Sequence, residues 1–354
     1  MASNSFGQIF RITTFGESHG KGMGVLIDGC PAQIPIDLQK IQAELDRRKP
    51  GQSKLTTQRK EDEDFTVMSG IFEGQTLGSP IAITVPNKDA NPKEYQRFKD
   101  IYRPSHADYV YDAKYGHRDY RGGGRSSARE TVNWVAAGAI AKQVLHHLYP
   151  ELQIQGFVSQ IGDVHLATAL DQLDLSITEN NPVRCPDAEK AKTMQEVIEQ
   201  ARKAKDSLGG CITCLVRNMP AGLGEPVFDK LESDLAKAML NINASKGFEI
   251  GEGFQSAGMK GSEHNDEFYY DEQRDQITTQ TNHSGGVQGG ISNGEELNFR
   301  VAFKPVATIP QNQQTVDKYG EAVNLEGKGR HDPCVVPRAV PIVEAMTALV
   351  LVDH

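Results

Sequence analysis

Alternating apolar and polar residues predict several β-strands in the N-terminal part of the chain. The stretch QIFRITTF at 8–15 alternates in this way, and GMGVLID at 22–28 follows it after a polar loop. A third alternating pattern covers 81–85, where every second residue is Ile or Val, and Pro86 closes it. We therefore expect a sheet that contains at least these three strands.

Apolar residues at helical spacing predict helices between and after the strands. Asp37 caps the first helix, which ends near Arg47 and Arg48 and places Leu38, Ile41 and Leu45 on its apolar face. The second begins with a capping box at Ser127–Glu130, in which the hydroxyl and the carboxylate satisfy first-turn amides. Its apolar residues are Val132, Val135, Ala136, Ala139 and Ile140, and a further helix carries Met194, Val197, Ile198 and Ala201.

Two segments of similar sequence, one in each half of the chain, indicate an internal repeat. LIDGCPA at 26–32 resembles LVRNMPA at 215–221, and amphipathic helices follow at 37–48 and 228–240. We interpret the chain as one domain of two duplicated halves, roughly 1–150 and 151–354. Helices packed against sheets from both halves indicate an α+β fold and not alternating βαβ units.

Composition limits the classes of function. The chain has 354 residues, of which 38% are hydrophobic and 24% charged, as is typical of a soluble globular protein. A net charge of -9 and a pI near 5.6 argue against a general nucleic-acid partner. The start MASNSFGQIF has no signal-peptide pattern, and the apolar C-terminal stretch is short and contains Glu344, so we expect a cytoplasmic protein without a membrane partner.

The cysteines carry no metal or disulfide signature. Cys211 and Cys214 form a CxxC motif, but GGCITCLVRN is typical of a buried strand, on which these two side chains point to opposite faces. No second CxxC completes a zinc site. We expect reduced thiols.

Glycine-rich segments are the first candidates for binding chemistry. RDYRGGGRSSARET at 118–131 places three glycines, Arg and two Ser before a helix, which favours a phosphate cradle over the alternative, a hinge before a capped helix. It matches neither Walker A nor the dinucleotide fingerprint. A second cluster, NHSGGVQGGISNG at 282–294, is either a flat-ligand contact or a plain loop.

Three histidines have reactive neighbours: His19 in GESHG, His106 in RPSHAD and His331 in GRHDP. A histidine titrates near ~6.5, so each could transfer protons at neutral pH. A zinc site and a Ser–His–acid hydrolase with Ser18 stay open, although GESHG is not a nucleophile elbow. The flanking cations indicate a pocket for a multiply anionic ligand; they are Arg48, Lys54, Arg59, Arg103, Arg125, Arg129 and Arg338.

Taken together, six segments resemble the chorismate synthase family. They are GESHG, RPSHADY, YRGGGRSSARET, INASKGFEIGEGF, NHSGGVQGGISNG and GRHDPCVVPRAVPIVEAM, in order along nearly the whole chain. The resemblance implies a shikimate-pathway lyase that converts 5-enolpyruvylshikimate 3-phosphate to chorismate and phosphate by a 1,4-anti elimination, with reduced FMN. It also implies a sandwich with a helical layer between antiparallel sheets, assembled as a homotetramer.

The resemblance also implies roles for individual residues. His19 matches the proton donor to the leaving phosphate, with Ser18 as its hydrogen-bond partner. His106 matches the residue that protonates reduced flavin, and Asp332 matches the acid near flavin N5. The implied substrate contacts are Ser18, Arg48, Lys54, Arg103, Arg129 and Arg338. The implied FMN contacts are Arg125, Ser126, Ser127, Asn243, Ala244, Gly289, Lys304, Pro305, Val306, Ala307, Thr308 and Arg330, and Arg48 and Lys54 are the implied NADP contacts.

Two departures from the family pattern affect these contacts. Lys54 replaces the arginine of many relatives, so a bidentate clamp becomes a point charge. Val306 and Ala307 lack the hydroxyls that bacterial relatives often carry. Reduction of FMN by the protein itself with NADPH and reduction by an external reductant are both compatible with the sequence. The second hypothesis is a flavin- or nucleotide-binding module that kept the pocket but lost activity. We expect 47–60 and 311–330 to become ordered on flavin binding.

Overall fold

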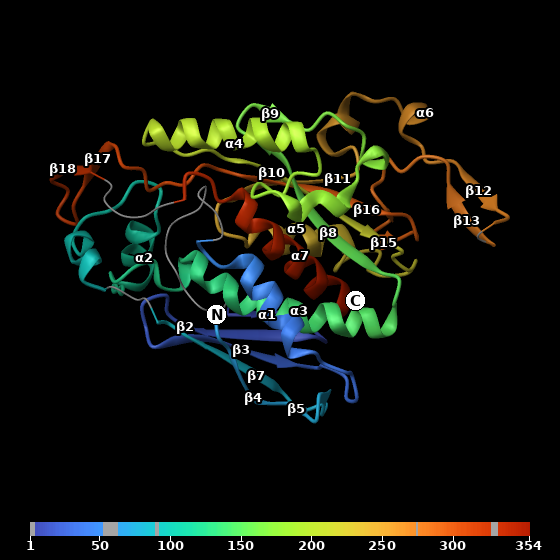
Figure 1. Ribbon diagram of the computed structural model, residues 1–354, viewed down its shortest axis with the longest axis horizontal. Coiled ribbons are helices and arrows are strands. Elements are labelled where there is room, and N and C mark those ends of the chain that lie inside the picture. Colours follow the sequence, from blue (N-terminus) through green and yellow to red (C-terminus); the bar gives the residue numbers. More distant parts are fainter. Residues whose placement is uncertain (1–3, 52–62, 89–91, 274, 327–331) are drawn as a thin grey trace.

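Two antiparallel β-sheets enclose a layer of helices. The structure is a computed structural model that describes residues 4–51, 63–88, 92–273, 275–326 and 332–354. Figure 1 shows the first sheet below the central helices and the second above them, with the C-terminus at the end of the innermost helix. The predicted α+β sandwich with a helical core layer is confirmed.

The first sheet comes from the N-terminal part of the chain, and all its neighbours are antiparallel. Its strand order is β1-β2-β3-β7-β4. The strands are β1 (Ser5–Phe6), β2 (Arg11–Gly16), β3 (Gly22–Asp28), β4 (Thr66–Ser69) and β7 (Ile81–Pro86). β3 and β7 begin and end close to where alternation predicts, whereas β2 starts three residues later than the pattern at 8–15.

The second sheet has the order β11-β16-β10-β8-β9 and is also antiparallel. Its strands are β8 (Gln153–Ile161), β9 (Val164–His165), β10 (Gly210–Arg217), β11 (Ser245–Ile250) and β16 (Leu297–Phe303). The strand order β2-β3-β7-β4 in the first sheet corresponds to the order β8-β10-β16-β11 in the second sheet. Along the chain, one helix comes after β3 and another comes after β10. The predicted division of one domain into halves at 1–150 and 151–354 stays a prediction.

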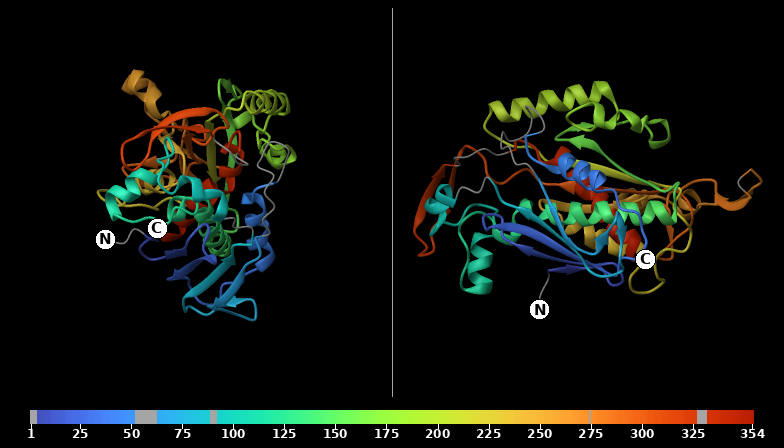
Figure 2. Two further views of the ribbon diagram at one scale, coloured as in Figure 1. Left: turned by 90° about the vertical axis from the view of Figure 1, so that its left-hand side faces the viewer. Right: turned by 60° about the horizontal axis from the view of Figure 1, so that its bottom comes forward.

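The helical layer separates the two sheets. It consists of α1 (Leu38–Arg48), α3 (Thr131–Leu148), α5 (Leu231–Leu240) and α7 (Val336–Asp353). α3 packs on β3 and β7, α7 packs on β8 and β10, and the two helices pack on each other. A further helix, α4 (Ala188–Lys203), contacts β8 and β9 from the outer side, as Figure 2 shows.

Hairpins, short helices and 3-10 turns are attached to this sandwich. The hairpins are β5–β6 (Ile71–Phe72, Gln75–Thr76), β12–β13 (Phe268–Asp271, Gln276–Thr279), β14–β15 (Val287–Gln288, Ile291–Ser292) and β17–β18 (Asn312–Val316, Ala322–Glu326). The short helices are α2 (Asp108–Tyr115) and α6 (Gly261–His264), and 3-10 turns include η1 (Pro92–Phe98), η2 (Gly124–Ser126), η3 (Ala128–Glu130), η4 (Leu170–Gln172), η5 (Leu175–Asn180) and η6 (Gly253–Gly258). The polar stretch 87–125 thus contains helical turns, and 312–326 is a hairpin. The sequence analysis expects flavin binding to order 47–60 and 311–330. Within these two segments, 52–60 and 327–330 lie outside the described residues.

The first helix forms for the predicted reason. The Asp37 carboxylate accepts a hydrogen bond from the Gln39 amide at 2.8 Å, which caps α1. Ile41 and Leu45 are fully buried, as predicted, but Leu38 is 46% exposed because it lies in the first turn, beside the cap.

The predicted capping box at the second helix is wrong. Ser127 Oγ accepts from the Arg129 amide at 3.2 Å, so it caps the turn η3, and α3 itself begins only at Thr131. Glu130 does not return to Ser127, because its carboxylate accepts from Arg125 at 2.6 Å. The helix is buried on nearly all sides since it lies between a sheet and α7.

The CxxC residues point to different surroundings, as predicted. Cys214 Sγ lies 3.8 Å from Thr347 Oγ1 on α7, inside the sandwich. Cys211 Sγ instead donates to Gln160 Oε1 on β8 at 3.4 Å. All five cysteines are free thiols, and burial raises the pKa of Cys30 and Cys185 to about 11.

Gly138 marks a very close approach of α3 to α7. A Cβ built there would lie 2.5 Å from Ala345 Cβ and 2.7 Å from Ala345 Cα. We expect Gly138→Ala to lower the free energy of unfolding by about 1–3 kcal/mol in chemical denaturation, since overpacking outweighs the better helix propensity of alanine. Gly258→Ala is the control, because a Cβ there meets nothing within 4 Å. Equal losses in both variants would contradict the close crossing.

Candidate active site

A cavity of about 1290 Å³ opens where the loops of the first sheet meet the N-terminal ends of α3 and α7. Seventeen predicted site residues line it: Ser18, His19, Arg48, Arg103, His106, Arg125, Ser126, Ser127, Arg129, Asn243, Ala244, Lys304, Val306, Ala307, Thr308, Asp332 and Arg338. Pro305 is not on the described wall, and neither is Gly289, which lies in the β14–β15 turn. Lys54, Arg59, Arg330 and His331 lie outside the described residues.

His19 is held by contacts on several sides. Ser18 Oγ lies 3.0 Å from His19 Nδ1, which is the hydrogen bond that the resemblance implies. The Tyr95 ring meets the imidazole edge to face, with centroids 4.6 Å apart. Asn87, just after β7, donates to the carbonyls of Glu17 and Gly20 at 2.9 and 3.0 Å. The loop GESHG is therefore anchored to the first sheet.

The backbone of the triple-glycine segment lies directly against the imidazole. Gly122 has φ +97°, and a Cβ there would lie 2.2 Å from His19 Nδ1 and 3.0 Å from Ser18 Oγ. Both the positive φ and the missing space exclude a side chain at this position. Gly122 thus provides the close approach that places His19.

His106 is the second cavity histidine. Its Nε2 lies 2.5 Å from Thr308 Oγ1. Ser105, just before it, has φ +57°, and the His106 amide donates to the Arg103 carbonyl at 3.2 Å. This tight turn turns the imidazole toward the segment 304–308, and Thr308 orients the ring.

Arg48 and Arg129 share one carboxylate, Glu63. Arg129 Nη1 donates to Glu63 Oε1 at 2.8 Å, and Arg48 Nε donates to Oε2 at 3.0 Å. A second donor of Arg48 also bonds Glu63, which is 1% exposed. Arg48 reaches Thr131 Oγ1 at 3.1 Å as well. The carboxylate fixes both guanidinium planes at the start of α3, and sequence reasoning missed it because nothing nearby in the chain marks Glu63.

The other cavity arginines also face carboxylates. Arg103 makes a two-point contact with Asp108, with both distances 2.8 Å, and Arg118 donates to the same group at 3.2 Å. Burial opposes ionisation of Asp108, but the hydrogen bonds and charge of Arg103 outweigh it and lower the pKa. Arg338 pairs with Asp332. The spacing of Arg103 and Asp108 in RPSHAD could have indicated their pair.

Arg125 is turned into the protein. It donates to Glu130 and to Thr14 Oγ1, both at 2.6 Å, and to the Gly16 carbonyl at 3.2 Å. Burial raises the pKa of Glu130, although Thr14, Arg125 and Asn133 oppose this. Arg125 therefore connects the start of α3 to β2 and closes one wall of the cavity.

Asn243 provides an observation that bears on a cofactor. Its Nδ2 donates to the Ser126 carbonyl at 2.9 Å, whereas its Oδ1 is buried without a hydrogen-bond partner among the described residues. Such an acceptor is costly unless a ligand or water donor meets it. Ala244 follows in the left-handed region with φ +68°, and its carbonyl accepts from the Lys304 amide at 2.9 Å.

The described residues contain no cluster of three His, Cys, Asp or Glu side chains placed to hold a metal ion, and His331 is not among these residues. They also contain no helix with the length and apolar character to cross a membrane.

Comparisons with known proteins agree over nearly the whole chain. The family model described as chorismate synthase matches residues 10–354. A chorismate synthase of Cytophaga hutchinsonii is 58% identical over 351 residues, 99% of this chain and 97% of that protein. One of Methylacidiphilum infernorum is 60% identical over 351 residues, 99% of this chain and 95% of that protein.

A solved structure agrees as well. A crystal structure of chorismate synthase superposes with a TM-score of 0.77 at 31% sequence identity, covering 98% of this chain and 92% of that chain. The sequence matches and the common fold lead to the same conclusion. This chain belongs to the chorismate synthase family, whose members are carbon–oxygen lyases.

Proposed function

We propose that the protein converts 5-enolpyruvylshikimate 3-phosphate to chorismate and phosphate by a 1,4-anti elimination, with reduced FMN bound. The observation that carries this proposal is the convergence of His19, His106 and Asp332 with six arginines on one cavity, among them Arg48, Arg103, Arg129 and Arg338. The substrate has two carboxylates and a phosphate, so a cavity in a chain of net charge -9 must supply local positive charge.

The arginines supply that charge in fixed orientations. Arg48 and Arg129 are set by Glu63, Arg103 by Asp108, and Arg338 by Asp332. A planar guanidinium that is already oriented loses little side-chain freedom when it binds a carboxylate or a phosphate. We assign Arg48, Arg103, Arg129 and Arg338 to the substrate, together with Ser18 and Lys54; Lys54 is outside the described residues.

His19 is the residue we assign to the leaving phosphate. Rupture of the C–O bond places charge on that group, and a protonated imidazole beside it lowers the barrier by general-acid catalysis. Ser18 and Gly122 hold the ring in place. Asp332, held by Arg338, is the acidic residue that we assign to the place near flavin N5 where the C6 proton departs.

The residues present suit FMN beside the substrate. A cavity of about 1290 Å³ exceeds the ~300–1,000 Å³ of ordinary ligand pockets, which fits two ligands side by side. The buried Asn243 Oδ1 lacks a donor within the described structure. We assign the flavin to Arg125, Ser126, Ser127, Asn243, Ala244, Lys304, Val306, Ala307 and Thr308, and His106 holds a proton for it. When bound, reduced FMN supplies electron density to the substrate transiently.

The remaining assignments are part of the same proposal. Gly289, Pro305 and Arg330 as FMN contacts, and Arg48 and Lys54 as NADP contacts, rest on the family resemblance. So do the homotetramer and the cytoplasmic location. Oxidation of NADPH with added FMN under anaerobic conditions would separate self-reduction from an external reductant.

We expect release of inorganic phosphate from 5-enolpyruvylshikimate 3-phosphate only when FMN is present and reduced. A phosphate assay under anaerobic conditions, with oxidised FMN and with no FMN as controls, measures this. Release at the full rate without flavin would contradict the proposed reaction.

We expect His19→Ala and His106→Ala each to lower kcat by about 10²–10⁴-fold, because each removes a positioned proton donor. Circular dichroism checks that both variants are folded. His165→Ala, at an exposed position on β9, is the control and keeps wild-type turnover. Wild-type kcat in either cavity variant would remove that histidine from the mechanism.

We expect Gly122→Ala to lower kcat by about 10²-fold, because the added methyl group displaces the His19 ring by an ångström or more. Gly116→Ala is a matched control, since Gly116 also has a positive φ of 68° but a Cβ there meets nothing within 4 Å. The control loses stability through backbone strain alone. Equal turnover in the two variants would show that contact with His19 is unimportant.

A further inference from the structure

Arg184 connects the two segments that carry Arg48 and Arg338, although it does not line the cavity. Its side chain is buried, and the residue is 6% exposed. Nη2 donates to the Arg47 carbonyl at 2.9 Å, and Nη1 donates to the Pro337 carbonyl at 2.6 Å. Each acceptor belongs to the residue directly before a cavity arginine.

Both carbonyls lack a donor within their own helix, for different reasons. In α7 the partner of the Pro337 carbonyl would be the amide four residues on, but that residue is Pro341, which has no N–H. In α1 the Arg47 carbonyl belongs to the last turn, where no helical amide follows. The planar guanidinium of Arg184 satisfies both acceptors at once.

Arg184 is itself held rigidly. Its φ is +60°, and the amides of Val183 and Cys185 on either side donate to Asn181 Oδ1, both at 3.2 Å. The Arg184 carbonyl accepts from the Val158 amide of β8 at 2.8 Å. Arg184 is thus fixed to the second sheet, and its guanidinium group holds the end of α1 and the start of α7 relative to that sheet.

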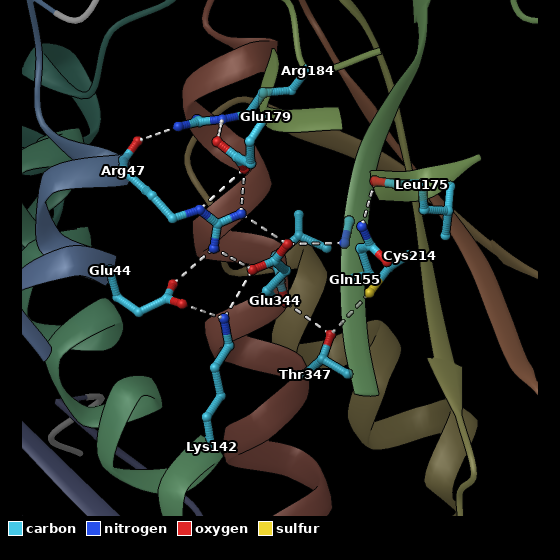
Figure 3. A network of polar contacts seen from close by, with 12 residues as sticks. Glu44, Arg47, Lys142, Gln155, Leu175, Glu179, Arg184, Cys214, Glu344 and Thr347 are labelled. Carbon is cyan, nitrogen blue, oxygen red and sulfur yellow. Dashed lines mark hydrogen bonds and ion pairs between the residues drawn. The ribbon is translucent and has the colours of Figure 1, made fainter. Parts of the chain in front are cut away.

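An ionic network that runs from the half-exposed Glu179 to the buried Glu344 extends from this contact. Glu179 accepts from Arg184 Nε at 3.1 Å and from Arg47 Nη2 at 2.7 Å, as Figure 3 shows. Arg47 continues to Glu344 at 2.6 Å, and Lys142 bonds the same carboxylate at 2.8 Å. No contact described for Lys142 involves the Arg47 or Pro337 carbonyls, so it belongs to the network without touching the cavity segments.

We propose that Arg184 is a positioning residue for substrate binding. It fixes the end of α1 against the start of α7, so the guanidinium groups of Arg48 and Arg338 keep the spacing that a ligand with several anionic groups requires. At the wall itself, the two segments are joined by Arg338 Nε, which lies 3.4 Å from the Arg48 carbonyl. The identity of the ligand, 5-enolpyruvylshikimate 3-phosphate, rests on the proposed function.

The test compares Arg184→Met with Lys142→Met, which removes another, partly buried cation from the same network. Both full-length variants are measured well below their melting temperatures. We expect Arg184→Met to raise KM and the calorimetric Kd for the substrate at least tenfold, with a smaller change in kcat. Lys142→Met loses stability but keeps Kd within twofold. Arg184→Lys, which keeps the charge but not the planar fork, gives an intermediate Kd.

Hydrogen exchange supplies a readout that needs no ligand. We expect the amides at 46–49, 338–340 and 342 to exchange at least tenfold faster in Arg184→Met and not in Lys142→Met. An unchanged Kd in Arg184→Met, or an equal rise in both methionine variants, would overturn the inference. If Arg184→Met does not fold, Arg184→Lys decides, and a wild-type Kd there overturns it.

Failure of the proposed function gives a different result. A wild-type protein that neither binds nor converts the ester contradicts the proposed function alone. Hydrogen exchange then decides on Arg184: faster exchange confined to the arginine variant supports it, and equal exchange in both variants overturns it.

Discussion

The arrangement of the central helices depends on one buried carboxylate, Glu344, in the middle of α7. Burial opposes its ionisation, but Lys142 and Arg47 outweigh this and hold its pKa far below the usual range. Its partners come from three other elements: Arg47 from α1, Lys142 from α3, and the Gly156 amide from β8 at 3.0 Å. Breaking such a pair leaves an uncompensated charge and typically costs about 3–5 kcal/mol, so α1, α3 and β8 are each constrained relative to α7.

The same constraint reaches the cavity through neighbouring residues. Arg47 bonds Glu344 while the next residue, Arg48, faces the cavity wall. Arg48 in turn bonds Glu63, a carboxylate that also orients Arg129. Opposed carboxylates give the cavity arginines defined directions and lower the repulsion between them in the absence of a ligand. An anionic ligand therefore meets a site in which the positions of the positive groups are already set.

Local sequence patterns predicted helices, strands and candidate reactive residues. They did not predict the contacts between residues that lie far apart in the chain. Asp37 caps α1 and the strands β3 and β7 form as expected, because capping and alternation depend on adjacent residues. The capping box failed because Arg125 bonds Glu130. The contact of Gly122 with His19 joins positions more than a hundred residues apart, and no spacing in the sequence encodes it. The motifs identified which residues matter, while the three-dimensional pairings came only from the fold.

The related strand order of the two sheets has a consequence for charge. In each half, a long helix follows the inner strands: α3 after β7, and α7 after β16. Both helices begin at the cavity, since Arg129 and Thr131 at the start of α3 and Val335 and Arg338 at the start of α7 all line it. Each helix start carries a partial positive charge, which favours anions within the first turn. The corresponding strand order of the two sheets therefore directs the starts of two helices at one cavity, and this acidic chain obtains positive charge there from its backbone as well as from its arginines.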